Sequence, residues 1–373
     1  MLILGASARA AAFSALRAGL RPTCGDLFAD RDLAAVADVR RVEAWNDLDG
    51  LEDVAASAPP GPWIYTGGLE NLPELVDRLA AARQLWGVCG DTLRAVRDPF
   101  VVAKALEAAG LPCPAVRATA DGLPRDGTWL AKPIGSAGGE GIRALGPDDS
   151  GWPFRSYYQR YVDGKSLAAL FVGDGRGATL IGVTRQLLGR PGAPFAYVGS
   201  IGPCRLRRAF EDRVAALGQT LVREFGLVGL FGVDFILNDG LPWPVEVNPR
   251  FTASVENMEL ALGRPLLDDH RRACDSTAPR APIGLADGPR PRVVGRAVVF
   301  AEGPCRFPEI EGWKAPDPSR FEVPEVADVP QPGSKFEAGE PVLTVFATGH
   351  NLRDCEGRLG RTLARWRQHL IIL

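Results

Sequence analysis

The sequence predicts an α/β protein with an α+β central part and a small β-rich C-terminal unit. Three observations carry this prediction. A strand, a turn and a helix open the chain, glycine-rich loops separate short strands in its middle, and short β runs precede a final helix. A chain of 373 residues is long enough for two or three domains. We expect domains at residues 1–95, 96–265 and 266–373, the central one divided into lobes at residues 96–157 and 158–265.

The first domain is expected to contain a parallel sheet. Leu2–Leu4 predicts a strand, GAS a turn, and residues 10–18 a helix that ends at Gly19, while GDLFAD and WIYTGG indicate further strand ends. The turn GASARA lacks the second and third glycines of the dinucleotide-binding fingerprint, and no acidic residue follows at the expected position. The sequence therefore argues against a dehydrogenase.

The central and C-terminal parts show mixed helix and strand patterns. DPFVVAKALEAAG predicts a helix that Gly110 closes. The strands expected in the central part are TWLAKPI, RALG, YYQRYV, LAALFVG, ATLIGVT, GLFGVDFIL and PWPVEVN, with a helix at residues 211–224 among them. The polar, proline-containing stretch 266–291 predicts a connection. After it, RVVGRAVVFA and EPVLTVFATG predict strands, and residues 361–369 predict a closing helix.

Composition and charge exclude several classes of protein. Lys and Arg number 43 and Asp and Glu 45, so a net charge of -2 offers no basic field for nucleic acid or an anionic membrane. The seven cysteines and three histidines form no CxxC pair or zinc-ligand spacing, which argues against a zinc site or a disulfide framework. No apolar run has the roughly 18 residues that a membrane helix needs. We therefore expect a cytoplasmic protein.

A carboxylate pair is predicted in the stretch FGVDFILNDGLPWPVEVNPR. Its two apolar runs flank NDG, a strong hairpin signal, and a turn centred on Gly240 places Asp234 opposite Glu246, with Asn248 and Arg250 farther along the same face. Like charges that face each other across a ladder are destabilising, so a divalent cation is expected between them, and two carboxylates with an amide suit Mg²⁺. The alternative is a solvated hairpin with outward charges, and a slip of one residue would separate the carboxylates.

A glycine-rich loop follows Lys132 in WLAKPIGSAGGEGI. Glycines and small residues at positions 135–141 let backbone N–H groups wrap an anion, so the loop is a candidate phosphate cover. It does not match the Walker pattern GxxxxGK[ST], and an ordinary flexible turn is the alternative. Lys104, in the preceding helix, is a second candidate cation, with a solvated helix lysine as its alternative. The strand YYQRYV, ahead of an Asp-Gly turn, could offer backbone groups to an adenine edge.

Taken in order, DPFVVAKALEAAGLPCP, WLAKPIGSAGGEG, YYQRYVDG and GVDFILNDGLPWPVEVNPRF resemble the nucleotide site of the ATP-grasp superfamily of carboxylate-amine ligases, which includes biotin carboxylase. Four ordered motifs are more specific than any one alone. The resemblance implies a Rossmann-like pre-ATP-grasp domain, a two-lobed ATP-grasp domain and a β-rich C-terminal unit. More narrowly, the chain resembles predicted carboligases related to biotin carboxylase and associated with methanopterin-linked one-carbon cofactor synthesis.

The resemblance implies a role for each candidate residue of the nucleotide site. The residues implied for ATP are Lys104 and Lys132 at the phosphates, Ser136, Gly138, Gly139 and Gly141 in the covering loop, and Gln159, Arg160, Tyr161 and Val162 at the adenine. Those implied for the metal and the transferred phosphate are Asp234, Glu246 and Asn248 as Mg²⁺ ligands and Arg250 beside the phosphate. The sequence departs from the family at Gln159, where Glu is frequent, and at Asp234, where Glu is more usual.

Two further segments are expected to contact the substrates. YTGGLEN could present Gly67, Gly68 and Asn71 to a substrate carboxylate, with a plain strand-to-helix turn as the alternative. The stretch RQLLGRPGAPFAYVGSIGP lies where the family has its acceptor contacts. Its candidate residues are Arg185, Gln186, Tyr197 and Gly199.

The activity that the resemblance implies is ATP-dependent ligation of a small-molecule carboxylate to an amine through an acyl phosphate, with release of ADP and phosphate. ATP and two Mg²⁺ ions are the expected cofactors, and Mn²⁺ would satisfy the same ligands. A homodimer is compatible with the resemblance. Two alternatives stay open: activation of bicarbonate followed by carboxylation of an amine, and a non-catalytic ATP-binding regulatory protein. The intact set of Asp234, Glu246 and Asn248 favours an enzyme.

Overall fold

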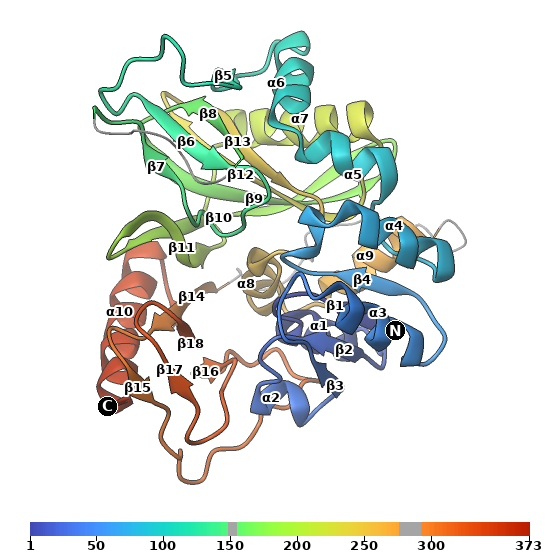
Figure 1. Ribbon diagram of the computed structural model, residues 1–373, viewed down its shortest axis with the longest axis vertical. Helices are drawn as coiled ribbons and strands as arrows, with labels where there is room; N and C mark the ends of the chain where they lie inside the picture. Colours follow the sequence, from blue (N-terminus) through green and yellow to red (C-terminus); the bar gives the residue numbers. More distant parts are fainter. Residues whose placement is uncertain (148–154, 276–291) are drawn as a thin grey trace.

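The computed structural model describes residues 1–147, 155–275 and 292–373. Its N-terminal and C-terminal parts lie side by side beneath a central part that contains both lobes of the middle segment (Figure 1). The backbone of Arg31 donates to the carbonyl of Val329 at 2.8 Å, so the two end parts are in direct contact.

The N-terminal part is a four-stranded parallel sheet with strand order β3-β2-β1-β4. Leu2 and Leu4 belong to one buried cluster and Ile3 to another, because successive side chains of a strand point to opposite faces and both faces are covered. The elements are β1 (Leu2–Leu4), α1 (Arg9–Arg17), β2 (Thr23–Asp26), α2 (Arg31–Ala34), β3 (Asp38–Arg41), α3 (Leu48–Ser57), β4 (Trp63–Tyr65), a 3-10 turn η1 (Leu69–Asn71), α4 (Pro73–Ala82) and α5 (Gly90–Arg97).

The small lobe of the central part is an antiparallel sheet with strand order β5-β8-β6-β7 and one helix. Its helix begins at Pro99 because Asp98 caps it and accepts hydrogen bonds from the N–H groups of Phe100 and Val101. The elements are α6 (Pro99–Ala108), β5 (Val116–Arg117), β6 (Trp129–Pro133), β7 (Arg143–Ala144) and β8 (Ser156–Arg160).

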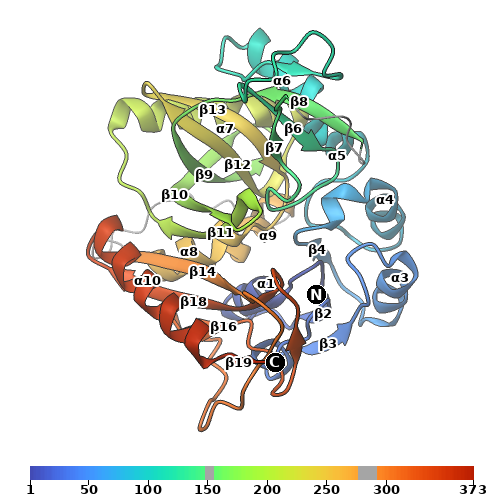
Figure 2. The same cartoon turned by 60° about the vertical axis from the view of Figure 1, so that its left-hand side comes forward.

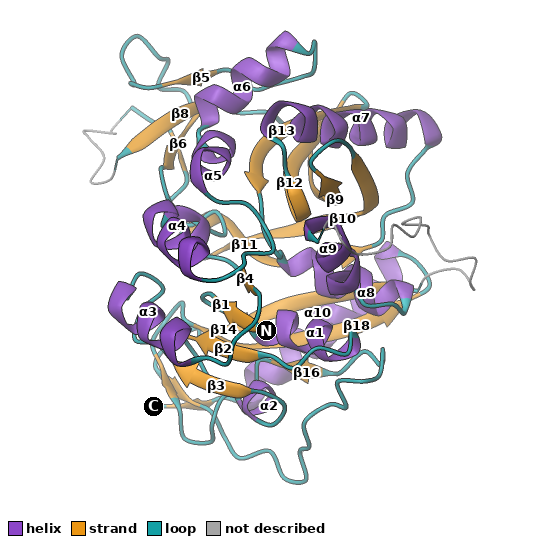
Figure 3. Ribbon diagram, turned by 90° about the vertical axis from the view of Figure 1, so that its right-hand side faces the viewer, coloured by secondary structure: helices purple, strands orange, loops and turns teal. Residues whose placement is uncertain are grey.

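The large lobe supplies most of an eight-stranded sheet with strand order β13-β12-β9-β10-β11-β14-β18-β16. The helix α7 packs on one face of this sheet, and α8 and α9 pack on part of the other (Figure 3). Residues of the face with α8 and α9 also line a cavity that the small lobe borders. The elements of this lobe are β9 (Lys165–Asp174), β10 (Ala178–Arg190), β11 (Ala193–Gly202), α7 (Arg208–Phe225), β12 (Val228–Asn238), β13 (Leu241–Asn248), α8 (Ala253–Leu262) and α9 (Leu266–Cys274).

The C-terminal part extends this same sheet, because β14 pairs antiparallel with β11 and β18 pairs with β14 (Figure 2). Its helix α10 packs on β14 and β18. The elements are β14 (Val293–Phe300), β15 (Cys305–Arg306), β16 (Val326–Ala327), β17 (Lys335–Phe336), β18 (Pro341–Gly349), α10 (Leu352–His369) and β19 (Ile371–Ile372). The expected boundary at residue 266 is thus not a boundary of the sheet, and the domain division stays a prediction.

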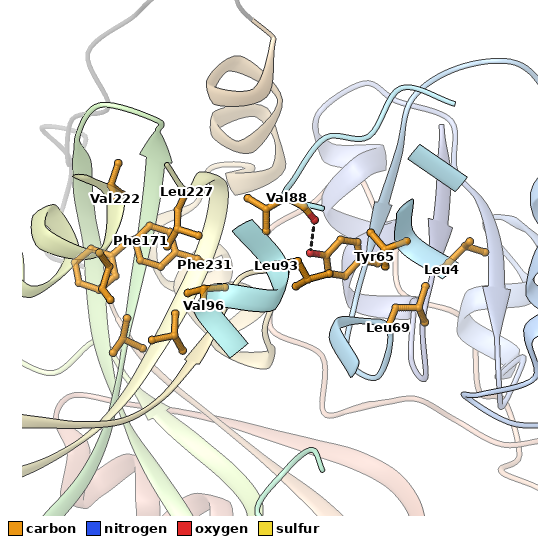
Figure 4. Packing of buried hydrophobic residues seen from close by; sticks show 14 of the residues in the cluster. Leu4, Tyr65, Leu69, Val88, Leu93, Val96, Phe171, Val222, Leu227 and Phe231 are labelled. Atoms are coloured by element: carbon orange, nitrogen blue, oxygen red, sulfur yellow. Dashed lines mark hydrogen bonds between the residues drawn. The ribbon is translucent and has the colours of Figure 1, made fainter. Parts of the chain in front are cut away.

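A continuous apolar core joins the N-terminal part to the large lobe (Figure 4). The rings of Phe171 and Phe231 stack with centroids 5.1 Å apart on the sheet side. On the N-terminal side, the Tyr65 hydroxyl donates to the Val88 carbonyl at 2.8 Å. Leu93 of α5 belongs to the same buried cluster. The N-terminal part is therefore fixed against the sheet that forms the floor of the cavity.

A buried charge network ties all three parts together at a second place. Arg9 of α1 forms ion pairs with Glu256 of α8 and with Asp328, which follows β16. Arg296 of β14 pairs with the same Glu256 at 3.2 Å and lies 3.7 Å from Asp328. The Arg9 side chain also lies 3.7 Å from Asp32 of the N-terminal part. The N-terminal, central and C-terminal parts each contribute charge to this network.

The structure confirms the mixed α/β fold and differs from the expected elements at several positions, two of which concern helices in the C-terminal third. The final helix begins nine residues earlier than expected, because the Asn351 side chain accepts from the Asp354 N–H at 2.9 Å and caps it. The stretch 266–291, expected as a connection, opens with the helix α9, and residues 276–291 lie outside the described residues. No helix in the described ranges has both the length and the apolar character needed to cross a membrane.

Candidate active site

A cavity of about 220 Å³ lies between the small lobe and the face of the large sheet. The small lobe lines it with Leu130, Lys132 and Gln159, and the large sheet with Asp234 and Glu246. A smaller pocket of about 70 Å³ adjoins it, shares Lys132, Gln159 and Glu246, and is bordered by Arg97. The residues predicted from the phosphate-loop and hairpin motifs thus meet in one place.

The hairpin of β12 and β13 places the two carboxylates opposite each other, as predicted. Asp239 and Gly240 form a two-residue turn with φ angles of 49° and 72°, and this turn pairs Asn238 with Leu241. That register, continued unchanged, would place Asp234 opposite Val245. The pairing instead shifts by one residue between Asp234 and Phe235, so that Asp234 faces Glu246. A β-bulge, and not the turn, therefore makes the carboxylate pair.

The two carboxylates differ in their electrostatic surroundings. Burial raises the pKa of Asp234 to about 7, and the nearby Glu246 adds to this shift. Burial alone would also raise the pKa of Glu246, but Arg97 and Lys132 outweigh it, so the pKa of Glu246 lies below its usual value. Asn248 donates from Nδ2 to Asp234 Oδ2 at 3.2 Å. Such a pair is suited to hold either a proton or a cation.

Lys132 is held at the centre of the site by two hydrogen bonds. Its Nζ donates to Gln159 Oε1 at 3.1 Å and to the carbonyl of Val245 at 3.0 Å. Val245 is the extra residue of the bulge, so the same backbone irregularity that aligns the carboxylates also positions the lysine. The buried Gln159 side chain holds Lys132 and also lines the cavity, and its place at the adenine stays a prediction.

The glycine-rich loop forms the roof of the cavity by resting on β11. The carbonyl of Gly138 accepts a hydrogen bond from the Tyr197 N–H at 2.7 Å. Gly139 has φ of 73°, and a Cβ at this position would lie 2.1 Å from the Phe195 carbonyl oxygen, so only glycine fits. Gly138 and Gly139 line the cavity, Ser136 lines the smaller pocket, and Gly141 packs against Pro133.

The end of the cavity away from the carboxylates is largely apolar. The described residues at that end are Leu130, Ile142, Arg160, Tyr161, Val162, Leu188 and Ile236. Three of them, Arg160, Tyr161 and Val162, were expected to line an adenine pocket. An apolar slot next to a strand end with polar backbone groups has the chemistry that a purine ring requires.

Arg250 is oriented by the N-terminal part. Its Nε donates to Glu70 Oε1 at 2.6 Å and its Nη2 to Asn248 Oδ1 at 3.2 Å. Glu70 also accepts from the Gly68 N–H at 2.7 Å, and a Cβ on Gly67 would lie 3.7 Å from the guanidinium carbon. The predicted Gly67 and Gly68 thus adjoin Arg250, although they do not line the described cavity. Glu70 itself carried no signal in the sequence.

Arg97 is the main residue that the sequence analysis missed. From the last turn of α5 it donates to Glu246 Oε1 at 2.8 Å and to the Val247 carbonyl at 3.1 Å. Its other nitrogen donates to Asn71 Oδ1 at 3.1 Å. The predicted Asn71 therefore contacts Arg97. The only available signal was a basic residue directly before the Asp-Pro helix start, which is not specific.

Three further candidate residues lie away from both the cavity and the smaller pocket. Lys104 is exposed on α6 and borders neither the cavity nor the smaller pocket. Its neighbour Ala103 lies on the buried face of the helix, so the Lys104 side chain lies on the solvent side. Arg185 points to the opposite face of β10, where it pairs with Glu356 at 2.8 Å. Gly199 packs on the backbone of Arg296. The other two candidates from the stretch RQLLGRPGAPFAYVGSIGP, Gln186 and Tyr197, do line the cavity.

The oxygen atoms of this site can bind a hard cation such as Mg²⁺ only if a bound molecule supplies further ligands. Within the described ranges, no three acidic, histidine or cysteine side chains gather as a metal site. Asp234, Glu246 and Asn248 supply oxygen donors of the kind that Mg²⁺ prefers, and Asn248 Oδ1 already accepts from Arg250. A cation here would complete its coordination with phosphate oxygens and water, as Mg²⁺ commonly does beside nucleotides.

The fold and this site have the features of an ATP-grasp domain. The sequence model of the ATP-grasp domain family matches residues 96–254, which include Lys132, both carboxylates and Arg250. The chain therefore contains an ATP-grasp domain, which confirms the resemblance seen in the sequence.

Known proteins are similar to this chain over different lengths. An uncharacterized protein of Methanocaldococcus jannaschii is 26% identical over 230 residues, which are 59% of this chain and 51% of the relative. The biotin carboxylase of Campylobacter jejuni, solved as an ATP complex, has a TM-score of 0.74 at 13% identity, covering 100% of this chain and 92% of its own. The L-amino acid ligase of Bacillus licheniformis has a TM-score of 0.73 at 17% identity, covering 100% and 98%. This chain spans about half of the length of the M. jannaschii relative.

Proposed function

We propose that this protein is an ATP-dependent ligase that activates a small-molecule carboxylate as an acyl phosphate and joins it to an amine. The observation that carries the proposal is the meeting, in one cavity, of the Asp234 and Glu246 pair with the cations Lys132 and Arg250. Phosphoryl transfer depends mainly on positioning and on neutralising the phosphate oxygens, and these groups can supply both.

Each group has a distinct task in the proposed reaction. The apolar end between Leu130 and Ile236 holds the adenine, Lys132 and the glycine-rich loop hold the phosphates, and Asp234, Glu246 and Asn248 hold one or two Mg²⁺ ions. Bound Mg²⁺ would neutralise charge on the β- and γ-phosphates, and Mn²⁺ fits the same donors. Arg250, which Glu70 holds in place, lies where it can contact the carboxylate that accepts the phosphoryl group.

The bonds and charges of the proposed reaction balance without a protein nucleophile. A carboxylate oxygen attacks the γ-phosphorus, the bond to the bridging oxygen breaks, and ADP leaves. The amine nitrogen then attacks the acyl carbon, the acyl–phosphate bond breaks, and phosphate leaves with the pair of electrons. The nitrogen loses a proton to the departing phosphate or to water.

Activation of bicarbonate is the nearest alternative within the same site. Bicarbonate, like a carboxylic acid, is an anion at neutral pH, so its charged oxygen could attack the γ-phosphorus in the same way. Release of ADP that depends on bicarbonate would favour this alternative. A place in one-carbon cofactor synthesis and a homodimer remain predictions from the resemblance, and a cytoplasmic location remains a prediction from the composition.

The two lysines of the sequence prediction supply a matched test of the nucleotide site. We expect Mg-ATP to raise the melting temperature of the wild type, since a ligand at 100 times its Kd adds about 2.7 kcal/mol to stability. Lys132→Met should lose this shift, whereas Lys104→Met, which removes an exposed lysine outside the cavity, should keep it. Equal shifts in all three proteins would place the nucleotide elsewhere.

Product analysis tests the reaction itself. With a panel of acids and amines, the wild type should release ADP and phosphate in equal amounts, and Glu246→Gln should abolish turnover. Release of AMP and pyrophosphate would contradict the acyl phosphate route. The regulatory alternative would instead be supported if the wild type showed no turnover and Glu246→Gln still bound Mg-ATP weakly.

A further inference from the structure

Beyond Asp234, the cavity continues over β9, β10 and β11 into an end where the described lining side chains, apart from Arg250 at its border, carry no charge. The polar side chains of the described residues lining this inner end bear only hydroxyl or amide groups. They are Thr184, Gln186, Tyr197, Ser200, Thr252 and Ser254.

Strand register fixes where this inner end lies. Asp234 pairs with Ala168 on β9, and Ala168 pairs with Thr184 on β10. Thr184 is therefore two strand spacings, or about 9 to 10 Å, from the carboxylate across the sheet. Ala168 has the smallest side chain on this row and leaves open space above the sheet between the two.

Thr184 has an unused hydroxyl at this position. The residue is only 1% exposed, and its Oγ1 has no hydrogen-bond partner among the described residues. Its methyl group faces Gly202, because a Cβ added to Gly202 would lie 2.6 Å from Thr184 Cγ2. The hydroxyl therefore occupies the other position on the Thr184 Cβ. A buried hydroxyl left without a partner is costly, which indicates that a bound molecule completes its hydrogen bonding.

The neighbouring hydroxyls are arranged to share this role. Tyr197 donates to Ser200 Oγ at 3.0 Å, which leaves the Ser200 hydrogen to be donated elsewhere. Thr252 and Ser254 bond each other at 2.8 Å. Gln186 accepts from Ser166 at 2.7 Å and donates to Asp234, so it positions the metal-side carboxylate. Thr184 and Ser200 thus have unused capacity, and one hydroxyl of the Thr252 and Ser254 pair also keeps a free hydrogen.

Among the described residues, the cation next to this end is already paired. Arg296 lies next to Ser200 in the sheet, its guanidinium pairs with Glu256 and lies near Asp328, and its Nε is buried without a partner among those residues. Arg250, at the junction with the carboxylate pair, is the cation that the first carboxylate would use. A dicarboxylate would bring a second negative charge into a buried space whose nearest cation is already balanced by carboxylates, which is unfavourable.

We propose that this inner end is a subsite for a hydroxyl group of the acid substrate, read by Thr184 and Ser200. The substrate class is a small monocarboxylic acid that carries a neutral hydroxyl. This inference rests on the proposed function for the identity of the reacting carboxylate, but hydroxyl recognition can be tested separately.

The test uses two pairs of acids whose members differ by one hydroxyl. The pairs are lactate with propionate and 3-hydroxybutyrate with butyrate. Succinate is added as a dicarboxylate. Hydroxylamine serves as the amine, because its nitrogen attacks the acyl phosphate, phosphate leaves, and a hydroxamate accumulates that added ferric chloride converts to a coloured complex. The variants are Thr184→Val, which removes the hydroxyl at equal size, Thr184→Ser, which keeps it, and Thr179→Val as a control on the same strand outside the cavity.

We expect the wild type, Thr184→Ser and Thr179→Val to prefer a hydroxy acid over its deoxy partner at least tenfold in kcat/KM, and Thr184→Val to lose that preference with its KM for ATP unchanged. An equal preference in Thr184→Val, or succinate as the best acid, would overturn the subsite.

A binding measurement separates this proposal from the proposed function. Protein saturated with MgADP should be stabilised against heat by a hydroxy acid and not by its deoxy partner, and Thr184→Val should lose this difference. Hydroxyl-selective binding without ADP release would keep the subsite and contradict the ligase. Turnover without hydroxyl selectivity would keep the ligase and contradict the subsite, with water as the partner of Thr184.

Discussion

Single residues far apart in the sequence determine the charge balance of the site. Glu246 and Arg97 are 149 positions apart, yet their side chains meet at 2.8 Å. The hairpin motif predicted the carboxylates because both lie in one local segment. The same reasoning could not reach Arg97 or Glu70, because their roles depend on how the N-terminal part packs against the sheet.

Replacing Arg97 tests its role as the cation of the metal-free site. Arg97→Leu should lower the free energy of unfolding by about 2 kcal/mol, because Glu246 loses a charged hydrogen bond while it still faces Asp234. Saturating MgADP should recover much of this loss, since Mg²⁺ would supply the missing positive charge. Urea titrations with and without MgADP measure the difference. An identical loss in both conditions would show that Arg97 is important only for packing.

A buried histidine predicts how stability depends on pH. His270 accepts the Leu230 N–H at Nδ1, at 2.7 Å, and its Nε2 lies 3.0 Å from the Trp86 carbonyl, so the neutral ring fits both partners. Burial lowers the pKa of His270 to about 4. The unfolded chain takes up this proton near pH 6.5 and the folded protein near pH 4. Stability is therefore intact above pH 6.5 and falls between pH 6.5 and 4.

The expected loss from this residue reaches roughly 3 kcal/mol at pH 4. Urea unfolding between pH 7.5 and 4.5 measures it, with His270→Gln as the comparison. The variant should be less stable at neutral pH but should show a shallower decline on acidification. Parallel curves for the two proteins would assign the acid sensitivity to other groups.

At the scale of elements, the hairpin shows both the reach and the limit of sequence reasoning. The NDG signal and the strand period were enough to predict Asp234 opposite Glu246, and the structure confirms that pairing. The route differs, because the turn alone would have placed Val245 opposite Asp234. The segment has no reliable sequence signal for the bulge. The prediction therefore reached the correct pairing by assuming an incorrect turn centre.

Two adjacent glycines allow the roof of the cavity to be tested. Both Gly138 and Gly139 have positive φ, but a Cβ at Gly138 has no neighbour within 4 Å, whereas one at Gly139 meets the Phe195 carbonyl. Gly138→Ala should weaken ATP binding up to about tenfold through backbone strain alone. Gly139→Ala should weaken it clearly more, because the loop can no longer rest on β11. Calorimetric titration with a non-hydrolysable ATP analogue compares them, and equal effects would argue against this contact.

At the scale of the whole molecule, the fold class was predictable because long apolar strands and glycine stops are strong local signals. The arrangement of the parts was not predictable from those signals. The continuation of the sheet from β11 into β14 joins segments about a hundred residues apart, and no motif marks it. The same holds for the ion pairs of Arg9, which cross from α1 to α8 and to Asp328.

The charge network predicts that the three parts unfold together. Glu256→Gln should lower the free energy of unfolding by about 3 to 5 kcal/mol, because Arg9 and Arg296 would then share too little buried negative charge. Arg78→Met, which removes an ion pair between two partly exposed side chains, should change it by less than about 0.5 kcal/mol. Scanning calorimetry should show one transition in the wild type and earlier, broader melting in Glu256→Gln. A similar small effect in both variants would show that the network is dispensable.

The shared sheet also bears on aggregation. β11 is an interior strand only because β14 pairs with it, for example through Gly199 and Ala297. A fragment cut before β14 would leave the outer side of β11 with unpaired N–H and C=O groups next to the proposed hydroxyl subsite. Open edges of this kind recruit strands from other molecules. The C-terminal unit therefore shields the sheet from self-association, and the nucleotide-binding region is not a separable module.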